Sequence, residues 1–394
     1  MLRTKGVSCV FSRSRRTHCF IHLDISDHGS EDGAMDKAML DFYSNVILSS
    51  FSRLTATSAS ALTDGTISHD RITRFLSSGP KSSRDLWYRV KPLVRSIQSE
   101  DGVLIVDDTI AKKPHMDEND IVCWHYDHTE GRHVKGINLL SMLYHSNDIT
   151  LPVGYVIVSK TETTIDADTG KGKRVSRISK NEYFRQLLGF CVKNMPFRYV
   201  FSDVWYASAE NMKYIKRDLK RHFIMPLKHN RKVALSAQDK RRGRYVTVET
   251  LQFKDSMTQT VYLEGITFPL LLLRQVFTNK DGSTGFLYLV SSDTTLTYAT
   301  MTDLYQKRWK IEEYHKALKQ QCALTRSPAR TVVTQSAHIF CSLCAFVKLE
   351  MLRVITAVSY EGLKLNLYLH ALKTAFKHLK TLQPLNWASK PIFA

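Results

Sequence analysis

The chain has 394 residues, of which 43% are apolar and 24% charged, a balance typical of a folded globular protein rather than a disordered one. Its 56 Lys and Arg against 37 Asp and Glu give a formal net charge of +19, which indicates a polyanionic partner, most simply nucleic acid. A membrane-spanning role is not expected, because the longest apolar stretch, residues 331–347, contains Gln335 and His338 and a spanning helix needs about 20 mostly apolar residues.

The seven cysteines are odd in number and spread along the chain, which is typical of a reducing compartment rather than of a disulfide scaffold. Cys341 and Cys344 form a C-x-x-C within an apolar helical run, so we expect them in the core rather than at a metal. Residues 1–34 are polar and lack the apolar segment of a secretory signal. We interpret them as a disordered extension or an over-called start.

Residues 35–98 have apolar side chains at helical spacing. A helix over residues 56–62, a turn with Gly65 and a second helix over residues 69–76, with Ser68 as N-cap, resemble a helix-turn-helix. The second helix exposes Arg71 and Arg74, which makes them candidate DNA contacts. Many small helical subdomains share this pattern, so a purely structural role remains an alternative.

The centre of the chain changes to strands. An apolar run over residues 103–106 predicts a strand buried on both faces, and Asp107 and Asp108 follow it. The elements expected next are strands over residues 137–144 and 151–158, a helix over residues 183–192, and a strand over residues 198–201. A right-handed crossover lays that last strand parallel to the first. Asp203, which follows it, is then expected beside Asp107 at neighbouring strand ends, where ligand sites gather.

The region after residue 204 is basic and then rich in strand signals. Residues 205–245 contain twelve Lys and Arg against three acidic residues. A solvated face is one interpretation, but we favour contact with phosphates. Turn residues then separate strand patterns over residues 245–248, 260–263, 270–276 and 286–290. These patterns predict a β-rich insertion.

A helix expected over residues 300–323 carries four polar residues on one face: Tyr305, Arg308, Glu312 and Lys319. At about 100° per residue they lie within roughly 60° of arc, on a stripe about 21 Å long. Lys316 joins this stripe, whereas Glu313 points away from it. Such a set is not core material, and a solvated, salt-bridged face is one interpretation of it.

The spacing of these four residues resembles the Y-R-E-K signature of transposases of the insertion-sequence-four type. The resemblance covers residues 35–360 and includes an acid after an early strand, an acid after a later strand, and a β-rich insertion before the glutamate. It implies an α/β fold: an RNase H-like mixed sheet interrupted by a β-rich insertion, with helical N- and C-terminal regions. It also implies cut-and-paste movement of a DNA element with terminal inverted repeats.

By this resemblance, three acids form a catalytic, metal-binding triad: Asp107, Asp203 and Glu312. The family pattern of an acid, a variable residue and Thr selects Asp107, but periodicity does not separate it from Asp108. The implied cofactor is Mg²⁺, two ions with Mn²⁺ as a substitute, because carboxylates and a phosphate suit that ion. The implied DNA contacts are Tyr305, Arg308 and Lys319. Lys316 on the same helix face, and Arg71 and Arg74 on the earlier helix, are further candidates.

The expected organisation is an extension (1–34), a helical DNA-binding region (35–98), the first part of the core (99–204), the basic and β-rich insertion (205–299), the glutamate helix (300–330) and a helical C-terminal region (331–394). The implied partners are transposon ends and target DNA, bound by a homodimer in a bacterial-type cytoplasm, at the nucleoid and without membrane. Two alternatives stay open: an RNase H-like nuclease without strand transfer, and a non-catalytic DNA-binding remnant.

Two further motifs need an interpretation. His125 and His128 form a His-x-x-His, with His133 nearby; without a cysteine pair, we expect loop structure or DNA contact rather than zinc. Some transposases of the resembled type use an aromatic wedge from the insertion to form a DNA hairpin. None of the five tryptophans lies in the strand-rich part here, so the candidate substitutes are Tyr262, Phe268, Phe277 and Phe286.

Overall fold

The computed structural model describes residues 31–79, 81–165, 170, 172–254, 256–279 and 281–381, with side chains from residue 37. Most of the predicted extension lies outside this part of the chain, and residues 31–34 already belong to helix α1 (Glu31–Ser49). None of the helices in the described ranges has the length and apolar content that a membrane span requires.

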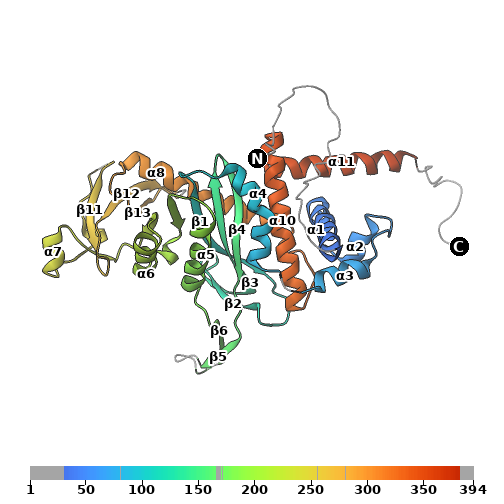
Figure 1. The fold of residues 1–394 in the computed structure, drawn as a ribbon, viewed down its shortest axis with the longest axis horizontal. Coiled ribbons are helices and arrows are strands. Elements are labelled where there is room, and N and C mark those ends of the chain that lie inside the picture. Colours follow the sequence, from blue (N-terminus) through green and yellow to red (C-terminus); the bar gives the residue numbers. More distant parts are fainter. Residues whose placement is uncertain are drawn as a thin grey trace, which may run out of the picture.

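One mixed sheet runs through the molecule (Figure 1). Its strands in the described ranges are β1 (Val103–Lys112), β2 (Val122–Asp127), β3 (Arg132–Ser146), β4 (Ile149–Ile157), β7 (Tyr199–Ser202), β8 (His222–Leu227), β9 (Lys232–Ala234), β10 (Val246–Thr247), β11 (Thr258–Leu263), β12 (Leu270–Thr278) and β13 (Thr284–Ser291). Their order is β10-β9-β11-β12-β13-β8-β7-β1-β3-β2, and β4 also pairs with β3. Together with helical N- and C-terminal regions, this confirms the predicted fold class.

The parallel pairing of β1 and β7 lies where the sequence predicts it, whereas β8 is not among the predicted strands. β7 runs parallel to β1, and β8 runs parallel to β7, whereas β3 is antiparallel to β1. Helix α5 (Lys180–Asn194) makes the crossover before β7 and buries Phe184, Leu187 and Leu188 along one side. The predicted return of the chain parallel to its first strand is therefore confirmed.

Two strand features differ from the prediction. β1 continues past Asp107 to Lys112, because the 15-residue β3 offers it a partner along its whole length. The segment around His125, expected as a loop, forms β2 on the other edge of β3, with His125 buried and Trp124 exposed. A separate ribbon of β5 (Glu162–Ile165) and β6 (Gly172–Val175) projects from the body (Figure 1).

The strands predicted in the insertion all form, and they continue the core sheet. β13 pairs antiparallel with β8, β12 pairs with β13, and β11 carries the sheet on to β9. The short helices of the basic stretch are α6 (Ala209–Lys213), a π-helical turn (Tyr214–Asp218) and α7 (Ala237–Arg241), with a 3₁₀ turn at Val248–Thr250.

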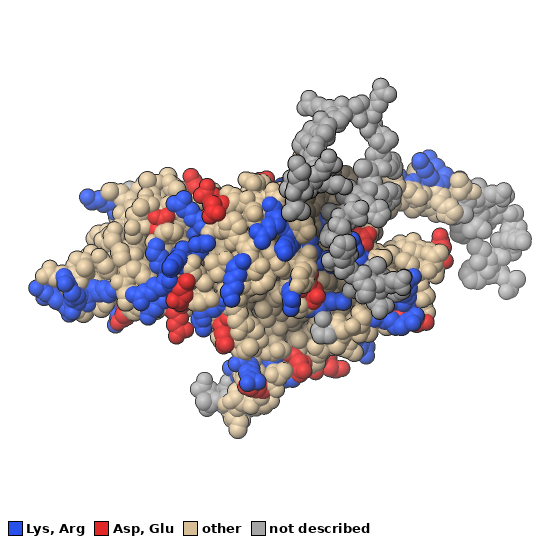
Figure 2. Space-filling view, viewed as in Figure 1, with Lys and Arg blue, Asp and Glu red and all other residues tan. Residues whose placement is uncertain are grey.

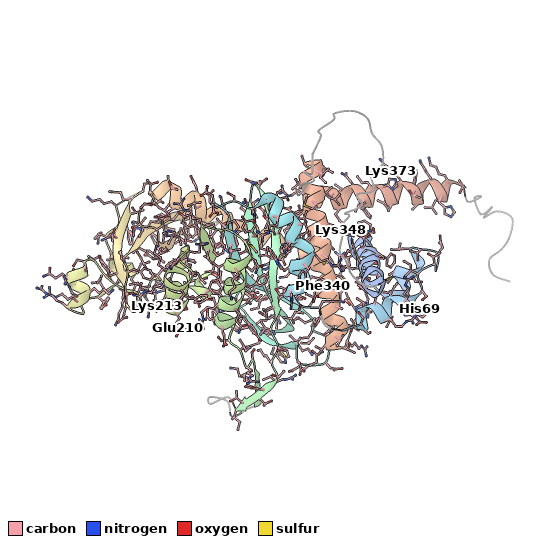
Figure 3. The ribbon with its side chains drawn as sticks, viewed as in Figure 1. His69, Glu210, Lys213, Phe340, Lys348 and Lys373 are labelled. Carbon is pink, nitrogen blue, oxygen red and sulfur yellow. The ribbon has the colours of Figure 1, made fainter. Side chains whose placement is uncertain are left out.

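The terminal helices pack on each other and on the sheet (Figure 1). They are α2 (Ala56–Ala61), α3 (His69–Ser77), α4 (Ser83–Ile97), α10 (Val332–Thr356) and α11 (Tyr360–Thr381). Ser68 caps α3, as predicted. Helix α10 contacts α1, α3, α4 and β4, and Figure 3 shows Phe340 and Lys348 on it. Lys348 binds Asp41 of α1, and Cys341 and Cys344 are buried, as expected.

Candidate active site

Two aspartates follow the last residues through which β1 and β7 pair with each other. Val106 of β1 lies opposite Ser202 of β7 at the end of their parallel register. Asp107 and Asp203 are therefore the next residues of neighbouring strands, as predicted. Asp203 also caps a 3₁₀ turn (Val204–Tyr206), because its carboxylate accepts a hydrogen bond from the backbone N–H of Val204.

Glu312 comes from a helix that is interrupted rather than continuous. Helix α8 (Tyr298–Gln306) passes through a 3₁₀ turn (Lys307–Trp309) into α9 (Lys310–Gln320). Arg308, in the turn, still reaches Glu312, with 3.2 Å between Nη1 and Oε1, and its guanidinium lies 5.8 Å from the centre of the Tyr305 ring. The Tyr305 hydroxyl donates to the carbonyl oxygen of Ser202 at 3.4 Å, next to Asp203.

Asp107 lies in the field of the other acids. Its pKa is raised to about 7, first by burial and then by the charges of Asp108, Asp203 and Glu312. Among the described residues, its carboxylate accepts one hydrogen bond, from the backbone N–H of Asp108 at 2.8 Å. Neighbouring carboxylates repel one another when all are ionised, and a cation between them removes that repulsion. The carboxylates of Asp107, Asp203 and Glu312 therefore fit a divalent metal ion.

Asp108 has the opposite surroundings, although it is the adjacent residue. Burial raises its pKa, but the net shift is downward because of the Lys180 charge and hydrogen bonds from Tyr206 and Asn138. The Tyr206 hydroxyl and the Asn138 amide each donate at 2.6 Å, and Lys180 Nζ lies 3.0 Å away. Successive strand residues point to opposite faces, which separates the two environments. Asp108 is therefore neutralised by protein groups, and Asp107 is not.

His315 is a residue of the site that the sequence interpretation missed. A ring nitrogen of His315 and carboxylate oxygens of Asp107 and Glu312 lie within 4.8 Å of one another. The side chain is buried, and its Nε2 has no hydrogen-bond partner within the described chain. Burial lowers its pKa to about 3, which keeps the imidazole neutral. Its position three residues after Glu312, on the adjoining helix face, is the only signal in the sequence.

The other predicted residues of the helix divide into two groups. Burial lowers the pKa of Lys319, while the charges of Asp127 and Glu312 act against that shift, so Lys319 lies within the electrostatic reach of Glu312. Lys316 instead binds Glu361 of α11 at 2.8 Å. Glu313, expected off the stripe, binds Lys310 at 3.1 Å. The structure therefore brings Tyr305, Arg308 and Lys319 to the acids but not Lys316.

A cavity of about 350 Å³ opens beside the acids. Its lining includes Asp203, Tyr305 and Arg308 from the core and Lys228, His229 and Phe286 from the insertion side. Figure 2 shows further Lys and Arg side chains towards the α7 end of the molecule, where Arg241, Arg242 and Arg244 are exposed. Figure 3 marks Lys213 and Glu210 on α6, in the same basic stretch.

Of the His-x-x-His motif, His125 is buried, whereas His128 belongs to a group of exposed rings with Tyr126 and His133. The Tyr126 ring lies 4.9 Å from His128 and 5.3 Å from His133, between centroids, and His128 lies 6.0 Å from Trp205. Lys180, which binds Asp108, lies 5.0 Å from the Trp205 ring. These rings therefore flank the acids on the Asp108 side.

Arg71 and Arg74 lie on the exposed face of α3. The opposite face buries Ile72, Phe75 and Leu76, and the helix contacts α1, α2 and α10. Figure 1 shows α3 on the side of α10 that faces away from the sheet. The structure thus keeps these two arginines apart from the acids and available to solvent.

Comparison with known families gives one match. Residues 98–347, more than half of the chain, match the family described as "Transposase DDE domain". This range begins just before β1 and ends within α10, so it contains Asp107, Asp203 and Glu312. Among curated proteins, none matches this chain.

Proposed function

We infer the activity of this chain from its family and its acids: the chain belongs to the transposase DDE domain family, and Asp107, Asp203 and Glu312 share one electrostatic environment. We propose that it is an insertion-sequence transposase of the insertion-sequence-four type. It binds terminal inverted repeats and moves its element by DNA cleavage followed by strand transfer. The observation that carries the proposal is geometric: carboxylate oxygens of Asp107 and Glu312 lie within 4.8 Å of each other, and Asp203 follows the end of the β1–β7 register beside Asp107.

In this proposal Asp107, Asp203 and Glu312 are the catalytic residues and the metal ligands. Two Mg²⁺ ions, or Mn²⁺ in their place, would activate the attacking oxygen and stabilise the leaving oxygen of an in-line displacement at phosphorus. Asp107 must lose its proton to serve as a ligand, and a pKa of about 7 allows this near neutral pH. Because water and then a freed 3′-hydroxyl can attack in turn, no protein nucleophile is needed.

Four residues of the glutamate helix are proposed to bind DNA: Tyr305, Arg308, Lys316 and Lys319. The planar guanidinium of Arg308 can bind two phosphate oxygens at once. Its hydrogen bond to Glu312 holds it at the cavity. Lys316 would first have to leave Glu361. Both side chains of that pair are more than half exposed, so we expect the exchange to cost little.

Three further surfaces are proposed to contact DNA. Arg71 and Arg74 on α3 are the candidates for recognition of the terminal repeat. The basic stretch of residues 205–245 would track phosphates. Phe286 is about half exposed and lines the cavity with Asp203, so it is our candidate for the aromatic that receives an unstacked base.

We also propose a homodimer on paired transposon ends, acting in a bacterial-type cytoplasm at the nucleoid. Helix α11 supports the dimer, because it carries a row of exposed apolar side chains: Leu365, Tyr368, Leu372, Phe376 and Leu379. An exposed apolar surface of this kind is typical of a protein interface.

The test uses the full-length protein with duplexes that carry the inverted repeats flanking its own gene, and a supercoiled target plasmid. We expect Mg²⁺-dependent cleavage at the repeat end and joining of that end to the plasmid. Cleavage without joining would identify an RNase H-like nuclease instead. Binding without cleavage would identify a non-catalytic remnant and contradict the proposal.

A further inference from the structure

His315 is a buried histidine without the partner that a buried histidine normally has. It is 6% exposed, and no described group hydrogen-bonds its Nε2. Buried polar side chains are nearly always satisfied, and the exceptions call for an explanation. His338 and His145 follow the rule: Nε2 of His338 contacts the Ala323 carbonyl at 2.9 Å, and Nδ1 of His145 contacts the Thr150 hydroxyl at 3.0 Å.

The position of His315 supplies an explanation. One of its two ring nitrogens lies within 4.8 Å of one carboxylate oxygen from Asp107 and one from Glu312, and these two oxygens also lie within 4.8 Å of each other. Nε2 of His125 lacks a partner too, but the structure places no comparable pair of carboxylates beside it within the described residues. Ligands on opposite sides of an ion with bonds of about 2.1 Å are about 4.2 Å apart, so small side-chain movements complete the site.

We propose that His315 is a protein ligand of the metal ion held between Asp107 and Glu312, which makes that site one of two carboxylate oxygens and one imidazole nitrogen. The inference rests on the proposed function, because it adds a ligand to the metal site of the proposed triad. Histidine is suited to the role by its chemistry, since imidazole is the commonest protein ligand of metal ions.

A nitrogen ligand changes which ion the site prefers. Imidazole suits transition metals, whereas Mg²⁺ takes oxygen ligands almost exclusively. We therefore expect the full-length protein to bind Mn²⁺ more tightly than Mg²⁺ by a margin that depends on His315. His315→Gln should weaken Mn²⁺ binding by about tenfold or more and Mg²⁺ binding by less, since loss of groups around metal sites typically costs about 10–100-fold.

The experiment is electron spin-echo spectroscopy of Mn²⁺ bound to the full-length protein without DNA. We expect ¹⁴N modulation from a coordinated imidazole in the wild type, its loss in His315→Gln, and its retention in the control His145→Gln, which changes an equally buried histidine away from the acids. Absence of ¹⁴N modulation from the Mn²⁺-loaded wild type, or its persistence in His315→Gln, would overturn the inference.

Two variants distinguish failure of this inference from failure of the proposed function. Asp107→Asn and Glu312→Gln should each weaken Mn²⁺ binding measured by titration. If both do so while the wild type shows no nitrogen coupling, the metal site is correct and His315 is not a ligand. If neither variant changes Mn²⁺ binding, or if the wild type binds no Mn²⁺, both the metal site and the ligand assignment are wrong.

Discussion

Two carboxyl groups in this molecule, the fully buried Glu350 and the half-buried Asp107, have opposite surroundings. Glu350 of α10 is fully buried and accepts hydrogen bonds from Thr150 N at 2.7 Å, Arg353 Nε at 2.7 Å and the Tyr360 hydroxyl at 2.6 Å. Asp107 accepts one backbone hydrogen bond in the described chain and is surrounded by further acids. A buried charge that protein donors neutralise holds elements together, here α10, α11 and the start of β4. A buried charge that they do not neutralise calls for a cation from outside.

The sharpest test of this contrast is Glu312→Gln, which keeps the size of the side chain and removes its charge. We expect Mg²⁺-dependent cleavage of a repeat-end duplex to fall by at least about 10²-fold, because even groups behind metal ligands cost 10–100-fold. DNA binding should persist or tighten, since a negative charge near phosphate is lost.

Glu313→Gln is the matched control for this variant, because Glu313 is the next residue and binds Lys310 outside the cavity. Its effect on stability should stay below about 0.5 kcal/mol, with cleavage near normal. An inactive Glu313→Gln beside an active Glu312→Gln would show that the assigned face of α9 is wrong.

Removing a donor from Glu350 is expected to lower the free energy of unfolding strongly without abolishing DNA cleavage. Arg353→Ala leaves a buried carboxylate with fewer donors, so urea unfolding should show a loss of about 3 kcal/mol. Lys348→Ala removes a more exposed ion pair on the same helix, for which we expect less than about 1 kcal/mol. Equal losses in the two variants would contradict the structural role of Glu350.

The pKa of Asp107 predicts that its removal stabilises the metal-free protein at high pH. Its folded-state pKa of about 7 exceeds the ordinary 3.8, so the folded state holds the proton more tightly. Stability is therefore lost as pH rises from about 4 through 7. Asp107→Asn should recover up to about 4 kcal/mol at pH 8 and clearly less at pH 5.

Asp108→Asn provides the opposite arm of that measurement. The pKa of Asp108 is lowered, so its charge contributes stability above the ordinary value, and that contribution disappears as pH falls. The variant should be less stable than the wild type at pH 8. Thermal melting of both variants at pH 5 and pH 8, in the presence of a chelator, measures the two effects. If Asp108→Asn stabilised the protein at pH 8, Asp108 would not be the acid that protein groups neutralise.

The smallest expected effect concerns phosphate contact by Arg308. Arg308→Ala should weaken repeat-end binding and reduce the log–log salt slope by about one, the value for one lost phosphate contact. Lys310→Ala, which removes a cation paired with Glu313 away from the cavity, should leave the slope unchanged. Fluorescence anisotropy over a salt series measures both, and an unaltered slope for Arg308→Ala would argue against phosphate binding there.

The sequence predicts the parallel pairing of β1 and β7 because crossover handedness follows from chain order alone. It does not separate Asp107 from Asp108, because the groups that neutralise Asp108 lie 30 to 98 positions away in Asn138, Lys180 and Tyr206. These residues come close to Asp108 only when the strands and α5 pack together. The choice between the two acids is therefore a property of tertiary structure.

The helix break and His315 are missed for other reasons. The 3₁₀ turn at Lys307–Trp309 contains neither proline nor glycine, so the local sequence does not predict a break in the helix. His315 sits among apolar neighbours on α9, where a histidine usually packs in the core. Only its missing hydrogen-bond partner, which depends on the whole surrounding fold, distinguishes it from His338.

The ladder between β8 and β13 has a mechanical consequence. Residues from Tyr288 to Ser291 pair with residues from Leu227 back to Ile224, so the wall that carries Phe286 is hydrogen-bonded into the same sheet as β1 and β7. That wall cannot swing away from the acids without breaking the ladder. A ligand that enters the cavity beside Asp203 is therefore expected to meet a wall of fixed position.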